Sequence, residues 1–276
     1  MKTFDAREIR RRILRMSFVG ATAHLGCSMS IVEILAVLYR SHLRLRRDDP
    51  DWPGRDYLVL SKGHGVMAQY ACLNELGWVT DDDLAHYSAD GTRLKGLSDA
   101  HVPGLEVTSG SLGHGLSVGV GLAMAAQRRG TDQRVYAIVG DGEMNEGAIW
   151  EAMLLANHAK LANLTIIVDA NGFQAMGRTD EIMQLDDLAA KFTAFGFEAR
   201  TIDGHDESAL DAVLTELKDH PSPSPRAIVA RTVKGNGISF MAGDNRWHYM
   251  RISPELLATA LAELAAAETG EEVPCR

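Results

Sequence analysis

Residues 140–177 most constrain how this chain can fold, because their pattern predicts a strand, a helix and a second strand in succession. The apolar run at 135–139 leads into a Gly-Asp-Gly turn around Asp141, and a second apolar run at 164–168 ends shortly before Asn171. Parallel strands joined by a helix place their carboxyl ends at one edge of the sheet, where ligands collect in open α/β folds. We therefore expect Asp141 and Asn171 to lie together at that edge.

The side chains at this edge suit a metal ion and a diphosphate group. Asp141 offers a carboxylate and Asn171 an amide oxygen, and hard cations such as Mg²⁺ or Ca²⁺ take oxygen ligands. Gly140 and Gly142 have no side chain, so a diphosphate can approach the backbone closely there. The turn therefore predicts a site for a metal-bound diphosphate. Taken alone, the same residues also fit a turn and a strand-end cap in a metal-free sheet.

Charge and cysteine content limit the partners and the compartment. A formal net charge of −9 disfavours nucleic acid, because phosphate backbones bind clustered positive surfaces. Three widely spaced cysteines, Cys27, Cys72 and Cys275, indicate a reducing compartment rather than a disulfide framework. The arginine-rich stretch at 7–15 fits an amphipathic helix better than a transit peptide, and no apolar run is long enough to span a bilayer. We expect a cytoplasmic protein that binds neither nucleic acid nor membrane.

Strand and helix patterns alternate along the rest of the chain. Further strands are predicted at 57–60, 197–202 and 227–233, and helices at 67–77, 116–126, 181–194 and 254–272. Ser30 has the position of a helix N-cap, with Glu33 three residues later as in a capping box. This alternation implies an α/β fold, a mostly parallel sheet with helices on both faces. Because no repeat or composition shift divides the chain, we expect one diphosphate-binding domain over 1–276 with a C-terminal helical tail.

Four motifs together resemble segments of the transketolase family, in the order found there. They are SKGH at 61–64, TSGSLGHG at 108–115, DGEMNEG at 141–147 and TVKGNG at 232–237. The Gly-Asp-Gly turn followed by Asn171 also resembles the family's thiamine diphosphate motif. The resemblance covers most of residues 7–250 and implies a thiamine-diphosphate-binding fold.

The resemblance is to only one part of a transketolase. Full-length transketolases continue with a pyrimidine-binding domain, whose glutamate activates the cofactor, and a third domain. The chain thus resembles the N-terminal subunit of a split transketolase, which implies a separate C-terminal subunit carrying the pyrimidine-binding domain and catalytic glutamate, in an α₂β₂ assembly. The implied reaction transfers a two-carbon ketol unit from a ketose, usually a sugar phosphate, to an aldose, and this chain alone should not turn over.

The resemblance also assigns roles, position by position. The metal ligands would be Asp141, Asn171 and the backbone carbonyl of Phe173. The cofactor contacts would come from His64, Gly110, Leu112, Gly140, Asp141, Gly142, Asn171 and His248. The catalytic set would be His24, His64, His101, His248 and Glu146, with Glu146 at a subunit interface. Imidazoles suit the proton transfers of this reaction because their ordinary pKa lies near the operating pH.

Two departures from the family pattern concern the substrate. Leu97 stands where a histidine that recognises the donor's hydroxyls is usual, and His101 lies four residues later, in a long loop expected over the site. His24 is followed by Leu25 rather than by proline. We therefore expect a modified or amino sugar as substrate. Two alternatives stay open: the α subunit of a thiamine-dependent 2-oxo acid dehydrogenase, and a non-catalytic binding homologue.

Overall fold

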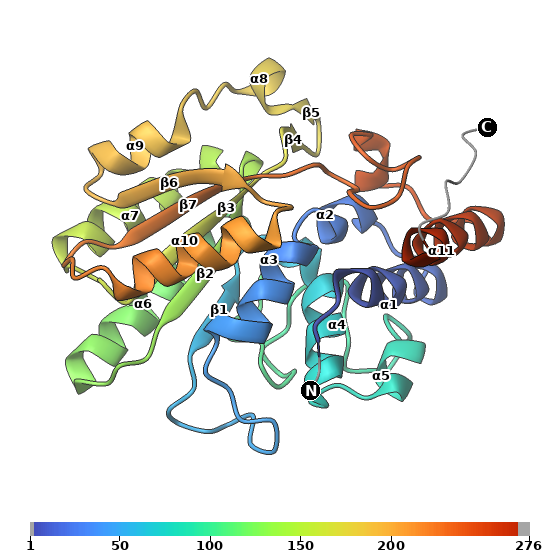
Figure 1. Cartoon of the computed structure of the whole chain (residues 1–276), viewed down its shortest axis with the longest axis horizontal. Helices are drawn as coiled ribbons and strands as arrows, with labels where there is room; N and C mark the ends of the chain where they lie inside the picture. Colours follow the sequence, from blue (N-terminus) through green and yellow to red (C-terminus); the bar gives the residue numbers. More distant parts are fainter. Residues whose placement is uncertain (1–2, 270–276) are drawn as a thin grey trace.

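A five-stranded parallel sheet organises residues 3–269, the part of the chain that this computed structural model describes (Figure 1). The strands are β1 (Tyr57–Leu60), β2 (Val135–Gly140), β3 (Leu164–Ala170), β6 (Glu198–Asp203) and β7 (Arg226–Arg231), in the order β1-β2-β3-β7-β6. All pairings are parallel, and the register places Gly140 beside Asp169. The five predicted strands are confirmed, and the carboxyl ends of β2 and β3 meet as expected.

The helices surround this sheet and the turns at its edge. They are α1 (Ala6–Val19), α2 (Leu25–Met29), α3 (Val32–Val37), α4 (Val66–Leu76), α5 (Asp81–Ala85), α6 (His114–Arg129), α7 (Gly147–His158), α8 (Thr179–Ile182), α9 (Leu188–Ala194), α10 (Glu207–Asp219) and α11 (Pro254–Thr269). The described residues also form four short helical turns. One is π-helical, η1 (Leu38–His42), and three are 3-10 turns: η2 (Gly63–Gly65), η3 (Gly142–Asn145) and η4 (Asn245–His248). A two-stranded antiparallel ribbon, β4 (Phe173–Gln174) with β5 (Gly177–Arg178), follows β3 and was not predicted.

Helices cover both faces of the sheet because its strands are apolar on both sides. Val135, Ala137 and Val139 of β2 lie in a core cluster with residues of α6, α7 and α9. Tyr136 and Ile138, the intervening residues, lie in a second cluster with residues of α1, α3, α4 and α10. This alternation is the two-residue period of a strand buried on both faces. It confirms the predicted α/β class.

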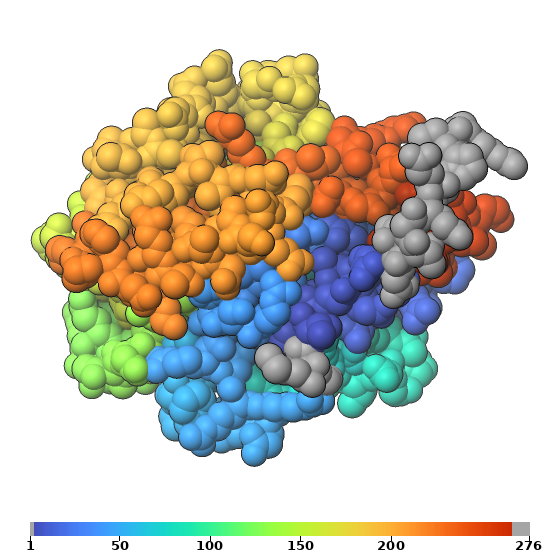
Figure 2. All heavy atoms as spheres, in the orientation of Figure 1, coloured from blue at the N-terminus to red at the C-terminus, as the bar shows by residue number. Residues whose placement is uncertain are grey.

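The segment of α10, orange in the space-filling view, packs against the blue segment of α3 on one face of the molecule (Figure 2).

The predicted tail helix is present as α11 up to Thr269, and the rest of that prediction, with Cys275, lies outside the described residues. Cys27 and Cys72 are buried free thiols. Among residues 3–269, no helix is both long and apolar enough to cross a membrane.

Two local predictions were wrong, each because a tertiary contact decides the outcome. Ser30 is not the N-cap of α3: Ile31 has that position, and the Ser30 hydroxyl donates to Asp169 Oδ2 at 2.8 Å. A buried carboxylate needs donors, and that need outweighs a local cap. The helix predicted at 181–194 is two short helices, because the Asp187 side chain accepts from the backbone N–H of Ala190 and starts α9.

Candidate active site

A cavity of about 640 Å³ opens at the carboxyl edge of the sheet, beside the ends of β2 and β3. Every residue predicted to bind the metal or the cofactor lines it: His64, Gly110, Leu112, Gly140, Asp141, Gly142, Asn171, Phe173 and His248. Of the remaining residues predicted to be catalytic, His24 and Glu146 also line it. The chain therefore brings together, from widely separated segments, nearly the whole predicted set.

His101 is the predicted residue that the structure does not bring to the cavity. Its side chain is 91% exposed, and its Nδ1 lies 2.7 Å from Asp99 Oδ1. The Asp99 carboxylate also accepts from the backbone N–H of His101, so this pairing is local to the loop. Leu97, by contrast, lines the cavity wall. In this conformation the side of the cavity near Gly110 is therefore apolar rather than imidazole-lined.

Asp141, at the end of β2, is buried and held by the backbone. Its Oδ1 accepts from the N–H of Gly142 at 2.8 Å, and its Oδ2 accepts from the N–H of Gly172 at 2.6 Å. Burial, reinforced by the nearby Asp169 charge, raises the pKa of Asp141 to about 7. A carboxylate whose charged form is penalised in this way is relieved by a cation placed against it. Asp141 is therefore built to take a positive charge.

Asn171 has a fixed orientation. Its Nδ2 donates to Asp169 Oδ2 at 2.8 Å, and its Oδ1 accepts from the N–H of Phe173 at 3.0 Å. An amide oxygen has two lone pairs, so Oδ1 retains acceptor capacity after this bond. Both Asn171 and Phe173 line the cavity beside Asp141. These oxygen atoms together suit a hard cation.

Asp169, which the sequence analysis missed, is the hub beneath these residues. It is fully buried and accepts from Lys62 Nζ at 2.5 Å, Ser30 Oγ at 2.8 Å, Thr232 Oγ1 at 2.5 Å and Asn171 Nδ2. Burial raises the pKa of Asp169, but the Lys62 charge and the donated hydrogen bonds outweigh it, so the pKa is lowered. In the sequence, the only signal for the ion pair of Lys62 and Asp169 is that each is a charged residue near the end of a buried strand.

Three of the histidines that line the cavity lie close together. The ring centroids of His24, His64 and His248 are 5.0 to 5.6 Å apart. Burial first, and then the charges of Lys62 and Lys234, lower the pKa of His24, take that of His64 well below its ordinary value and lower that of His248 to about 3. All three rings are therefore neutral at neutral pH.

Lys234 decides which nitrogen of His248 carries the ring proton. Its Nζ lies 3.0 Å from His248 Nδ1 and donates to Asn245 Oδ1 at 2.7 Å. An ammonium can only donate, so Nδ1 of the neutral ring accepts and the proton resides on Nε2. His248 thereby keeps an N–H donor for a group in the cavity that it lines.

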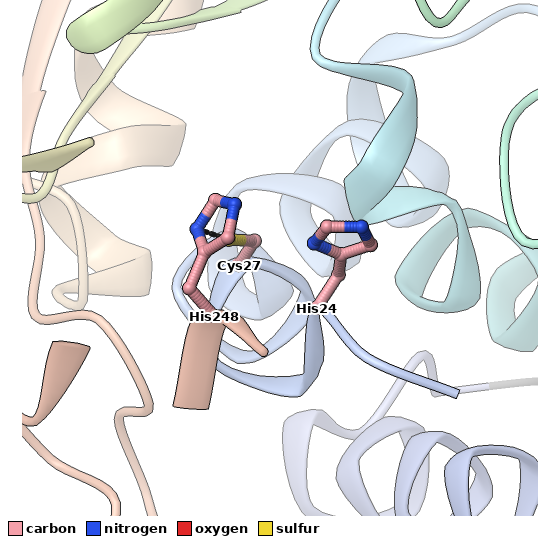
Figure 3. Close-up of side chains that lie close together, drawn as sticks. All are labelled: His24, Cys27 and His248. Carbon is pink, nitrogen blue, oxygen red and sulfur yellow. Dashed lines mark hydrogen bonds between the residues drawn. The ribbon is translucent and has the colours of Figure 1, made fainter. Parts of the chain in front are cut away.

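His24, Cys27 and His248 each bring a potential metal ligand within 4.8 Å of the others (Figure 3). No other group of three or more such side chains occurs in the part of the chain that the structure describes. Soft transition metals favour these ligands. However, Lys234 already occupies His248 Nδ1, and burial raises the pKa of the Cys27 thiol. A cation here would face an ammonium at contact distance, so we place no metal in this cluster.

Two further cavity residues were also missed. Gln174 lines the cavity with Nε2 buried and without a hydrogen-bond partner, and a side chain on Gly142 would collide with its Cβ. Glu143 is buried and accepts from Ser61 Oγ at 2.5 Å and from the N–H of Gly113 at 2.8 Å. Gln174 thus offers an unused donor, while Glu143 ties the glycine turn before α6 to the edge of the sheet.

Comparison with known proteins decides the family. Residues 8–260 match the family described as the thiamine diphosphate binding domain of transketolase. The chain belongs to the transketolase family. This match supports thiamine diphosphate as the cofactor, and the fold agrees: the chain superposes on the transketolase from Leishmania mexicana with a TM-score of 0.87 at 32% identity. The superposition covers 94% of this chain and 40% of that one, so the chain spans well under half of that transketolase.

Several relatives that match this chain almost end to end are named as transketolase subunits. An apulose-4-phosphate transketolase subunit from Actinobacillus succinogenes is 40% identical, covering 94% of each chain. The 6-deoxy-6-sulfo-D-fructose transketolase subunit SqwG of a Clostridium species is 38% identical, again covering 94% of each. The predicted likeness to the N-terminal subunit of a split transketolase is thereby confirmed, and so is the predicted enzyme class, a transketolase-type transferase.

Replacing Asp169 by asparagine tests the hub of this transketolase site, because Lys62 would be left buried without a counter-charge. Removing one partner of a buried ion pair costs about 3–5 kcal/mol. We expect Asp169→Asn to lower the free energy of unfolding by about that amount in urea denaturation. Asp180→Asn is the matched control: it removes the solvent-exposed pair with Arg178, at 2.9 Å, and should leave stability nearly unchanged. Equal losses in the two variants would contradict the role given to Asp169.

Proposed function

We propose that this chain is the thiamine-diphosphate-binding subunit of a two-chain transketolase that transfers a two-carbon ketol unit from a ketose to an aldose. One observation carries the proposal: a single cavity is lined both by Asp141 and Asn171 and by the neutral His24, His64 and His248. Relatives that match almost end to end and are named as single subunits of a transketolase support the two-chain arrangement. In this proposal residues 1–276 form one diphosphate-binding domain.

The cavity fits a metal-bound diphosphate on the evidence of its own atoms. Asp141, Asn171 and the carbonyl oxygen of Phe173 would hold Mg²⁺, or Ca²⁺, because they are hard oxygen ligands. Two residues that line the cavity, Gln174 and His24, each have a buried side-chain nitrogen without a hydrogen-bond partner in the structure, Nε2 and Nδ1 respectively. Buried polar atoms are normally paired, so unpaired ones in residues that line a cavity support the binding of a polar ligand there.

Thiamine diphosphate, when bound, supplies a carbon nucleophile and an electron sink. The chain's own residues bind and orient the reactants. His64 and His248 would donate to the diphosphate with Gly142, and Gly110 and Leu112 would present backbone atoms to the cofactor ring. A neutral imidazole can accept a proton, which suits His24 to hold the proton of a substrate hydroxyl.

Glu146 and His101 have less direct positions in this proposal. Glu146 precedes α7 at the cavity rim, where it would meet a neighbouring subunit. His101 would need its loop to move before it could reach a substrate, since its side chain now pairs with Asp99.

We further propose that the donor is a modified ketose, phosphorylated or otherwise acidic, or an amino sugar. The apolar Leu97 is 41% exposed on the cavity wall and offers no hydrogen bond to a donor hydroxyl. The relatives named for apulose 4-phosphate and for 6-deoxy-6-sulfo-D-fructose support a modified substrate. The partner would be a C-terminal subunit with the pyrimidine-binding domain and its catalytic glutamate, in an α₂β₂ assembly. The buried free thiols of Cys27 and Cys72 support a reducing, cytoplasmic location.

The two other functions have less support. The relatives reported above are transketolases and their subunits, which disfavours the α subunit of a 2-oxo acid dehydrogenase. A non-catalytic homologue would not need the complete set of Asp141, Asn171, His64 and His248 around one cavity. Release of CO₂ from a 2-oxo acid by the assembled pair of subunits would instead favour the function of a 2-oxo acid dehydrogenase subunit.

The pKa of Asp141 gives a direct test of the metal site. In the metal-free chain we expect the carboxyl carbon of Asp141 to titrate near pH 7, because burial and Asp169 raise its pKa to about 7. Protons and the cation compete for the same oxygen atoms, so Mg²⁺ with thiamine diphosphate should lower the midpoint by about 1–3 units. NMR of ¹³C-aspartate-labelled protein measures both midpoints, with Asp141→Asn for assignment. A midpoint that does not move when the ligands bind would place the metal elsewhere.

Reconstitution with the C-terminal subunit tests the reaction itself. We expect no ketol transfer by this chain alone, and transfer by the co-expressed pair once thiamine diphosphate and Mg²⁺ are added. With an apolar Leu97 on the donor side, kcat/KM should favour apulose 4-phosphate, a sulfonated ketose or an amino ketose over xylulose 5-phosphate by about tenfold, equivalent to about 1.4 kcal/mol. Turnover by the isolated chain would contradict the two-chain proposal, and preference for xylulose 5-phosphate would contradict the modified donor.

A further inference from the structure

Three residues that are not among those lining the cavity hold the segment that carries Lys234. We infer that Arg10, Glu33 and His205 are positioning residues, which keep the Lys234 ammonium against His248 and so fix the donor nitrogen of that ring. The inference rests on the proposed function, in which His248 donates a hydrogen bond to the diphosphate of the cofactor. The contacts come from three parts of the fold: α1, α3 and the turn after β6.

The first link runs from Glu33 through His205 to the backbone of Val233. The N–H of Val233 donates to His205 Nε2 at 2.7 Å. Because Nε2 accepts, the ring proton lies on Nδ1, which donates to Glu33 Oε2 at 2.9 Å. The side-chain amide of Asn236, in the same segment as Val233, also lies 2.9 Å from this Nδ1. Glu33 is buried in α3, so this link fastens the residue before Lys234 to the interior of the protein.

The second link runs from Glu33 through Arg10 to the backbone of Asn236. Arg10 Nη2 donates to Glu33 Oε1 at 2.5 Å, and Arg10 Nε donates to the carbonyl oxygen of Asn236 at 2.9 Å. Burial raises the pKa of Glu33, but its bonds and charge contacts with His205 and Arg10 outweigh that effect and lower it. Gly237, at φ +91°, lies so close that any side chain there would collide with the Arg10 guanidinium. One buried carboxylate thus anchors two points of the same segment.

Lys234 lies between these two points. The residue is 1% exposed, and its Nζ lies 3.0 Å from His248 Nδ1. If either link is lost, the segment can shift and carry the ammonium away from that nitrogen. The neutral ring could then place its proton on Nδ1, and His248 would no longer present a fixed Nε2–H to the cavity. The two links to Glu33 therefore affect cofactor binding through the tautomer of the His248 ring, although Arg10, Glu33 and His205 do not contact the cofactor themselves.

The test measures the His248 tautomer in the chain without cofactor, by ¹⁵N NMR of histidine-labelled protein, with His248→Asn for assignment. In the wild-type chain we expect the Nε2–H form. In His205→Ala a measurable share of the Nδ1–H form should appear. His205→Gln should restore the wild-type signature, because the glutamine oxygen can accept from the Val233 N–H. A His205→Ala chain with the wild-type tautomer would overturn the inference.

His42→Ala is the matched control for general loss of stability. His42 is another histidine paired with a carboxylate: it is buried, its Nε2 lies 2.9 Å from Asp211 Oδ1, and it does not line the cavity. Its loss should leave the His248 tautomer unchanged even where it lowers the melting temperature. A tautomer shift of equal size in His42→Ala would also overturn the inference. If His205→Ala fails to fold, Glu33→Gln takes its place. We again expect a measurable share of the Nδ1–H form of His248, and the wild-type tautomer in Glu33→Gln would overturn the inference.

Cofactor affinity in the assembled two-chain enzyme gives a second readout. Loss of a residue that orients a metal ligand typically costs 10- to 100-fold in metal affinity or activity, and by the same reasoning we expect the Kd for thiamine diphosphate to rise about tenfold in His205→Ala. It should recover in His205→Gln and stay unchanged in His42→Ala. If the wild-type pair bound no thiamine diphosphate, the proposed function would fail, whereas the tautomer in the cofactor-free chain would still decide this inference.

Discussion

The buried ion pair of Lys62 and Asp169 joins the parts of the chain that make the cavity. Asp169 lies near the end of β3 and accepts from Ser30, Thr232 and Asn171 as well as from Lys62, so the turns after β1, α2, β3 and β7 share one carboxylate. Removing both charges from water is costly, and the pair is stable only because these additional donors complete it. The orientation of Asn171, and with it the oxygen ligands of the cavity, follows from this arrangement.

The charges around the cavity favour one kind of ligand. Burial first, and then the charges of Lys62 and Lys234, keep the nearby histidines neutral, and Lys234 leaves His248 with an Nε2–H donor, which favours an anion beside these rings. Burial and the Asp169 charge raise the pKa of Asp141 to about 7, which favours a cation beside that carboxylate. A metal-bound diphosphate supplies both charges in one ligand. His24, Cys27 and His248 have ligand atoms close enough together to hold a metal ion. A cation is nevertheless disfavoured there, because the Lys234 ammonium already lies against His248 Nδ1.

How much could be predicted from the sequence depended on the range of the interaction concerned. The five strands were predictable because buried parallel strands are short apolar runs, and Asp141 and Asn171 because parallel strands end at one edge. Lys62 and Asp169 were not, since 107 residues separate them and neither carries a strong local signal. Ser30 was misjudged for the same reason: its local pattern fits a cap, but a distant carboxylate takes its hydroxyl. The positions of His101 and of the network around Glu33 likewise depend on loop and tertiary contacts.

Calorimetric titration of thiamine diphosphate into the assembled pair of subunits tests the central claim most directly. The claim is that Asp141 and Asn171 bind the diphosphate through a divalent cation. Wild-type protein should bind the cofactor with Mg²⁺ present and lose measurable binding when the metal is chelated, and Asp141→Asn should bind weakly in both conditions. Equal affinity with and without the metal, or full affinity in Asp141→Asn, would contradict the account.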